Sequence, residues 1–368
     1  MVFSCNKILL ANAVANGSKA ASSKSTLPTL EGIYIKLENN NLLLTGYDLE
    51  LGIQTTIEVN GDTDGEIVLN ARLINDILRK MPNEDITINV DDKFLTLIKS
   101  TQVEYTIVGM NPEEYPTLPE IKENDKLNIS QPLLKSMIEQ TIFAVSTDEH
   151  RAVLTGSLFV IEDNVFKIIS LDGYRLAIRT ERIEQSEDMR FIVPSKALYE
   201  VAKLLSDDDE DKLIINVGRK HIVFEISGYQ IISRLIEGEF LDYNDSIRKE
   251  SSTEVKISAG SFIESLDRAS LLINENTRSP VRCIFEDDKV KLSCVTALGK
   301  INDKIDCNIS GDTVEIGFNN RYLLDALRAS GSDEVLLKMS GGLSPMKIVP
   351  LDGDSFLFLV LPMRLRNE

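Results

Sequence analysis

The chain has 368 residues, of which 43% are hydrophobic and 27% charged, and its formal net charge is −18. This length predicts two or three domains. No apolar run reaches the roughly 20 residues that a membrane-spanning helix needs, and the apolar N-terminal segment lacks the basic flank of a signal peptide. Four cysteines without a C-x-x-C pair and only two histidines favour a reduced, cytoplasmic protein with no metal or cofactor.

A repeat of about 124 residues organises the chain. Three strand-to-helix junctions resemble one another, with a capping residue at Asn70, Ser195 and Asn319 and a cation within the next two positions. A second landmark is an aspartate at the end of an apolar strand, Asp48 in the first copy and Asp172 in the second, again 124 positions apart. A period this long predicts domains with separate cores rather than a solenoid.

Each copy is predicted to contain two amphipathic helices and several antiparallel strands around short turns, which is an α+β layer domain. The expected helices are 6–16, 70–81, 131–145, 195–205, 261–273 and 319–329. The copies place domains at 1–120, 127–245 and 252–368, and the expected linkers between them are the proline-rich stretch 111–119 and its counterpart 237–244.

The end of the chain has two possible interpretations. The apolar run 356–361 predicts a strand that stops before Pro362, which cannot donate to a ladder. The tail that follows, Met363-Arg364-Leu365, is either the frayed end of an edge strand or one wall of a groove. The repeat favours the groove.

Cations collect on the expected helices although the chain as a whole is acidic. The six helical ranges hold ten Lys or Arg and six Asp or Glu. A basic helical surface in an acidic protein indicates a side that faces a polyanion, and the alternative is the ordinary use of Lys and Arg as helix formers. No base-reading motif is present, so DNA binding is expected to be independent of sequence.

These landmarks resemble one family, the bacterial sliding clamp or β subunit of DNA polymerase III, over the whole chain. The resemblance rests on the segments LPTL at 27–30, SLDGYRLA at 170–177, VPSK at 193–196 and LPMRL at 361–365. It implies three clamp domains per chain and a head-to-tail homodimeric ring around duplex DNA, with the helices inside and the sheets outside. It also implies a processivity factor of DNA replication that tethers the replicative polymerase and has no catalytic residues.

The resemblance assigns three sets of site residues. The implied contacts to the DNA backbone are Lys24, Arg72, Arg79, Lys196, Arg278 and Arg321. The implied dimer interface joins Tyr105 and Ile107 of one copy of the chain to Leu271 and Leu272 of the other. The implied partner-peptide groove, with Arg175 and Arg364 at its rim, consists of Leu154, Leu171, Gly173, Tyr174, Arg175, Leu176, Leu241, Val360, Leu361, Pro362, Met363, Arg364 and Leu365.

The implied partners are duplex DNA, the polymerase catalytic subunit, a clamp loader and other clamp-binding replication and repair proteins. The groove is expected to take short extended peptides with a Gln and an apolar pair. The sequence departs from the family at Leu241, where proline is common, and at 244–246, which carries no cation. Two rival hypotheses remain: an enzyme that uses Asp48 or Asp172 as an acid or base, although such aspartates are more often turn residues, and a three-domain scaffold that never meets DNA.

Overall fold

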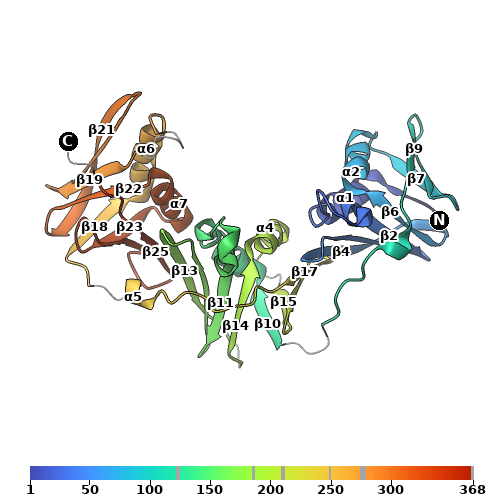
Figure 1. The fold of residues 1–368 in the computed structure, drawn as a ribbon, viewed down its shortest axis with the longest axis horizontal. Helices are drawn as coiled ribbons and strands as arrows, with labels where there is room; N and C mark the ends of the chain where they lie inside the picture. The colour runs from blue at the N-terminus through green and yellow to red at the C-terminus, as the bar shows by residue number, and fades with distance from the viewer. Residues whose placement is uncertain (122–124, 185–186, 209–211, 248–249, 274–278, 366–368) are drawn as a thin grey trace. The chain divides into compact units, whose positions relative to one another are not determined.

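The computed structural model describes residues 1–121, 125–184, 187–208, 212–247, 250–273 and 279–365 (Figure 1). The chain folds into two compact units, one made of 1–132 with 199–235 and the other of 133–198 with 236–368. Helices and antiparallel strands alternate as the repeat predicts. No described helix combines the length and apolar composition needed to cross a membrane.

The three copies of the repeat have the same order of elements, except that the first has one additional short strand, β5. The first contains β1 (Val2–Asn6), α1 (Lys7–Gly17), β2 (Gly32–Glu38), β3 (Asn41–Tyr47), β4 (Leu51–Glu58), β5 (Asn60–Thr63), β6 (Gly65–Asn70), α2 (Ala71–Lys80), β7 (Asp85–Val90), β8 (Leu95–Lys99) and β9 (Glu104–Val108). The second contains β10 (Asp125–Ser130), α3 (Gln131–Glu139), β11 (Gly156–Glu162), β12 (Val165–Leu171), β13 (Arg175–Arg182), β14 (Met189–Pro194), α4 (Ser195–Leu204), β15 (Lys212–Val217), β16 (His221–Ile226) and β17 (Tyr229–Arg234). The third, after the short α5 (Asn244–Ile247), contains β18 (Thr253–Ser258), α6 (Ala259–Ser270), β19 (Val281–Glu286), β20 (Lys289–Thr296), β21 (Gly299–Gly311), β22 (Val314–Phe318), α7 (Asn320–Ser330), β23 (Glu334–Met339), β24 (Met346–Val349) and β25 (Phe356–Val360).

Sheets run across both boundaries between the copies. At the first boundary β17 pairs with β4, and Ser233 lies opposite Leu51. At the second boundary β25 pairs with β13, and Val360 lies opposite Arg175 (Figure 1). The strands β4, β13 and β21 begin 124 positions apart and are therefore equivalent. Each boundary thus joins the last strand of one copy to the same strand of the copy before it.

The helix starts follow from capping residues. The Asn70 side chain accepts a hydrogen bond from the backbone N–H of Leu73, and Asn319 accepts from Arg321 and Tyr322, as expected for N-caps. Ser195 differs, because it is already the first residue of α4.

The expected helix 131–145 is too long. Helix α3 ends at Glu139, and a 3₁₀ turn covers Ile142–Ala144. The break lies at Thr141, whose φ of −122° is not helical and whose hydroxyl donates to the carbonyl of Met137 at 2.7 Å. A β-branched residue with a local hydrogen bond of this kind competes with continued helix formation.

The last strand is confirmed and ends before Pro362, but it is not an edge strand. In the sheet β25 lies between β13 and β24. Its residues Phe358 and Val360 are fully buried. The end of the chain is therefore anchored in the middle of a sheet.

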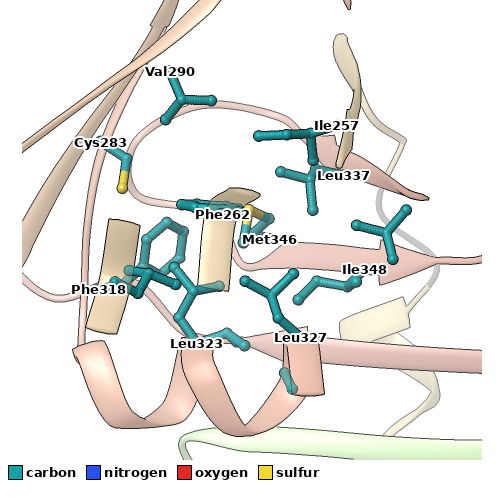
Figure 2. Close-up of a cluster of buried hydrophobic side chains, with 14 of the residues drawn as sticks. Ile257, Phe262, Cys283, Val290, Phe318, Leu323, Leu327, Leu337, Met346 and Ile348 are labelled. Carbon is teal, nitrogen blue, oxygen red and sulfur yellow. The ribbon is translucent and has the colours of Figure 1, made fainter. Parts of the chain in front are cut away.

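The third copy shows how helices and sheets share one core. Figure 2 shows Phe262 of α6 beside side chains of α7 and of the surrounding strands. The labelled residues are all buried and belong to a single apolar cluster: Ile257, Phe262, Cys283, Val290, Phe318, Leu323, Leu327, Leu337, Met346 and Ile348. Burial of each large side chain contributes about 1.5–3 kcal/mol. The helices α6 and α7 are therefore a stable support for the residues on their exposed surfaces.

Two buried thiols predict a loss of stability at alkaline pH. Burial raises the pKa of Cys283 from 9.0 to about 12, and burial together with the Asp85 carboxylate does the same for Cys5. The folded protein holds these protons more tightly than the unfolded chain. Their contribution is therefore complete below pH 9 and is lost as the pH rises from 9 towards 12. Urea midpoints should fall over this range, and should fall less in Cys283→Ala; equal slopes would exclude the thiol as a cause.

Candidate functional site

The aspartates that a catalytic hypothesis would use are turn residues. The Asp172 carboxylate accepts hydrogen bonds from the backbone N–H groups of Tyr174 and Arg175 at 2.8 and 3.0 Å. Asp48 accepts in the same way from Glu50 and Leu51 at 2.9 and 2.7 Å. Both carboxylates therefore stabilise the reversal of the chain between two strands.

The turn after Asp172 needs its glycine. Gly173 has a φ of +94°, in the left-handed region, and a Cβ there would lie 3.2 Å from Nη1 of Arg151. The Arg151 guanidinium also donates to the Asp172 carbonyl at 3.3 Å. The loop is therefore closely packed against the 3₁₀ segment Glu149–Leu154.

Pairing of β13 with β25 brings the expected apolar residues together. Leu176 lies opposite Leu359, and both are buried. They belong to one cluster with Leu154 and Leu171, although Leu154 and Leu359 are far apart in sequence. Leu154, Leu171 and Leu176, three apolar residues of the expected groove, thus pack in one cluster with Leu359 near the end of the last strand.

The tail is held at two points and does not fray within the described residues. The backbone N–H of Leu361 donates to the Tyr174 carbonyl at 2.9 Å, and that of Met363 donates to the Gly317 carbonyl at 2.8 Å. A Cβ at Gly317 would lie 2.8 Å from Cδ2 of Leu365, so the tail packs directly on β22. We call the following half-exposed or exposed apolar residues the tail surface: Leu361, Pro362, Met363, Leu365 and Tyr174.

Two residues expected in the groove have other environments. Val360 is fully buried in the core of the third copy and offers no surface. Arg175 is not at a rim, because its side chain is only 11% exposed and pairs with Asp172 and Asp325. Within 237–244 Phe240 is buried, whereas Leu241 is 57% exposed and stays available at the surface.

Sequence reasoning missed Tyr322. Its ring stacks on Tyr174 with centroids 6.1 Å apart, so an aromatic pair borders the tail surface. The only sequence signal was that Tyr322 occupies the helix position held by Leu73 and Ala197 in the other copies. Its contact with Tyr174 joins residues on two different copies of the repeat, which periodicity does not reveal.

The expected DNA contacts include cations at equivalent helix starts. Arg72, Lys196 and Arg321 are exposed and each is the second residue of its helix. A cation in the first helical turn opposes the helix dipole and costs about 0.3–1 kcal/mol. Together with those N–H groups of the turn that no capping side chain binds, however, it favours a bound anion such as phosphate. This placement recurs in all three copies, and the contact of these residues with DNA stays a prediction.

The other expected DNA contacts are less regular. Lys24 is exposed in the loop after α1, and the Arg79 side chain is 72% exposed near the end of α2. Arg278 lies outside the described residues.

Two open strand edges accompany the expected dimer residues. Within the described residues β9 is the last strand of its sheet, and residues 299–306 of β21 pair only with β20. Tyr105 on β9 is 37% exposed, whereas Ile107 packs partly against its own core. Leu271 is 81% exposed, and the sequence did not single out two further exposed apolar residues near the start of β21, Val295 and Leu298.

Comparisons with known proteins agree with this architecture. Family models of the DNA polymerase III beta subunit match residues 1–119 (N-terminal domain), 128–242 (central domain) and 246–364 (C-terminal domain). The chain is 35% identical to a beta sliding clamp of Staphylococcus epidermidis over 99% of both chains. It is also similar to the crystal structures of the Bacillus subtilis sliding clamp (TM-score 0.93, 31% identity, 100% of both chains) and of a Pseudomonas aeruginosa sliding clamp bound to griselimycin (TM-score 0.92, 27% identity, 99% and 100%). The chain therefore belongs to the DNA polymerase III beta subunit family, the beta sliding clamps.

Proposed function

We propose that two copies of this chain close head to tail into a ring around duplex DNA. The observation that carries this proposal is a strand pairing that occurs at both boundaries within the chain and could occur a third time between two chains. Strands β17 and β25 each pair with the equivalent strand of the copy before them, namely β4 and β13. Their counterpart β9 is at the edge of its sheet, and the next equivalent strand, β21, has an open edge over residues 299–306. Pairing of β9 with the β21 of another chain would complete the series.

The repeat also predicts the register of this pairing. When the three copies are aligned by their strand pairing, Ile107 takes the same position as Ser233 and Val360. Ser233 lies opposite Leu51, and Val360 lies opposite Arg175. Leu51 and Arg175 are the first residues of β4 and β13, and Gly299 is the first residue of the equivalent strand β21. Ile107 should therefore face Gly299 of the second chain, and Thr106 should face Lys300.

Side chains at the second boundary show which contacts the new interface would make. Phe143 packs edge-on against Phe358 with ring centroids 5.5 Å apart. Leu271 occupies the position of Phe143 relative to the preceding strand, and Tyr105 occupies that of Phe358. Leu271 and Tyr105 should therefore meet between two chains, where their exposed apolar surface would be buried.

Family membership makes the chain a clamp that acts as the processivity subunit of the polymerase and not a catalytic subunit. We place its domains at 1–120, 127–245 and 252–368 and its site of action in the cytoplasm. The DNA contact residues are Lys24, Arg72, Arg79, Lys196, Arg278 and Arg321. The ring would convert weak contacts with the polymerase into long residence on DNA, because tethering raises the effective concentration.

We assign the docking of partner peptides to the tail surface, supported by the buried residues Leu154, Leu171 and Leu176 and bordered by Leu241 and Arg364. A strip of half-exposed apolar side chains that the backbone holds in place is suited to an extended peptide with apolar residues. Methionine at position 363 can adapt to ligands of different shape. The expected ligands are segments of the polymerase catalytic subunit, the clamp loader and other replication and repair proteins.

The Arg72→Ala substitution tests the DNA face. It should weaken binding equally for all duplex sequences and lower the salt slope by about one unit per lost phosphate contact, or about two per dimer. Thermal stability should stay the same or rise slightly, because a cation leaves the positive end of α2. Anisotropy titrations at several salt concentrations measure the slope. Lys36→Ala, on strand β2, is the control that should leave it unchanged; an unchanged slope in Arg72→Ala would remove α2 from the DNA face.

A further inference from the structure

Arg175 is enclosed by groups from three segments of the chain. Its Nε lies 3.0 Å from Oδ2 of Asp172, in the turn before β13, and its Nη1 lies 2.6 Å from Oδ2 of Asp325, on α7. The guanidinium carbon is 4.5 Å from the centroid of the Tyr322 ring and 5.4 Å from that of Phe143. Both carboxylates and both rings therefore act on one cation.

This enclosure leaves Arg175 little capacity to bind a ligand. Its side chain and that of Asp172 are each 11% exposed, and a peptide carboxylate could reach the guanidinium only by displacing a carboxylate already in place. Arg151, with 49% of its side chain exposed, and the exposed Arg364 are the cations available to a peptide.

The same contacts fix the aromatic pair beside the tail. Tyr322 lies under the Arg175 guanidinium and also stacks on Tyr174, at an interplanar angle of 28°. The carbonyl of Tyr174 accepts the hydrogen bond from Leu361. Arg175 thus connects α7 to the turn at the point where the tail begins.

The equivalent positions at the first boundary do not form this arrangement. At the first boundary the position of Arg175 holds Leu51, and that of Tyr322 holds Ala197. The acid equivalent to Asp325 is Glu200, which pairs instead with Lys203 at 2.8 Å and with Lys19 at 3.5 Å. Of the two boundaries, as far as the structure describes them, the one that carries the tail surface has the bridged and stacked arginine.

We propose that Arg175 is a positioning residue that holds Tyr174 against Tyr322 and so forms the aromatic end of the peptide-docking surface. It makes no contact with the peptide itself. The inference rests on the proposed role of the tail surface, and it predicts that this end accepts an apolar or aromatic side chain and not a carboxylate.

The test compares two fluorescent synthetic peptides that carry a Gln and an apolar pair, one with an acidic residue and one in which that residue is neutral. The double variant Arg175→Met/Asp325→Asn removes the bridge without leaving Asp325 charged and unpaired. It should bind both peptides about tenfold more weakly, with an unchanged dependence on salt. Arg175→Lys, which keeps the charge but cannot bridge two carboxylates in one plane, should recover part of the loss.

Two readouts separate positioning from general destabilisation. Fluorine NMR of 3-fluorotyrosine protein should show altered Tyr174 and Tyr322 resonances in the double variant, with other tyrosines unmoved. Arg364→Ala should reduce the salt dependence for the acidic peptide alone. A loss in the double variant that is confined to the acidic peptide, or an unchanged affinity, would overturn the inference. Peptide binding that is absent in the wild type, or that survives removal of the tail, would instead refute the docking site.

Discussion

Deletion of Met363–Glu368 should reduce binding of a polymerase-derived peptide by about tenfold to a hundredfold. The deletion removes Met363 and Leu365, two half-exposed apolar side chains of the tail surface. Because each is already half-buried, a peptide that covered both would gain about 1.5–3 kcal/mol from the two together. The fold should persist because β25 ends at Val360 and keeps its pairing with β13 and β24. The lost hydrogen bond between Met363 and Gly317 costs only about 1 kcal/mol.

Isothermal titration of the peptide and a melting curve measure the two parts of this prediction. Leu351→Ala, at a 38% exposed site on another loop, is a control that should bind normally. If the truncated protein still bound the peptide, or if it unfolded, the tail would serve to hold the second and third copies together and would not be a docking surface.

Substitution of Leu271 by aspartate should convert the dimer into monomers. A charge placed in an apolar interface costs several kcal/mol, and each ring would contain the interface twice. Leu271 is 81% exposed in the single chain, so the substitution should leave the domain folded. Ile107 is a poorer probe, because it packs against its own core and its truncation would also destabilise the domain.

Sedimentation velocity at micromolar concentration distinguishes the two states. Leu343→Asp, at an 86% exposed position in the loop between β23 and β24, should remain dimeric. A wild-type protein that sediments as a monomer, or a Leu271→Asp variant that stays dimeric, would contradict the proposed interface.

The repeat, the helices and the last strand could be predicted because each depends on local chemistry. Asn70 and Asn319 cap their helices through their own side chains, and Pro362 ends the strand before it. The end of α3 was misplaced because the apolar pattern continues past Thr141, whereas its side chain favours a break.

The errors at the site arise from contacts between distant segments. Arg175 was expected at a rim because an arginine after a turn is usually exposed. Its second partner, Asp325, lies 150 positions further along the chain, and no local pattern indicates that the two meet. The strand pairing that buries Val360 is likewise a property of the assembled sheet, so the sequence indicated an apolar strand but not which side of it stays accessible.

Covalent closure of the proposed interface on DNA tests the ring most directly. Thr106→Cys with Lys300→Cys places two exposed thiols opposite each other in the proposed register. The native Cys5, Cys283 and Cys294 are buried, and the half-buried Cys307 is replaced by serine so that it does not compete. A short bismaleimide should then join two chains at both interfaces. Thr106→Cys with Lys304→Cys, displaced by about 13 Å along the strand, should not cross-link.

The double-cysteine protein is first loaded by its clamp loader onto nicked circular plasmid, then cross-linked on the DNA and washed with denaturant. The ring predicts that it stays on the circular DNA and is released when a restriction enzyme linearises the plasmid. Equal retention on circular and linear DNA, or failure of the matched cysteines to form a covalent dimer, would contradict it.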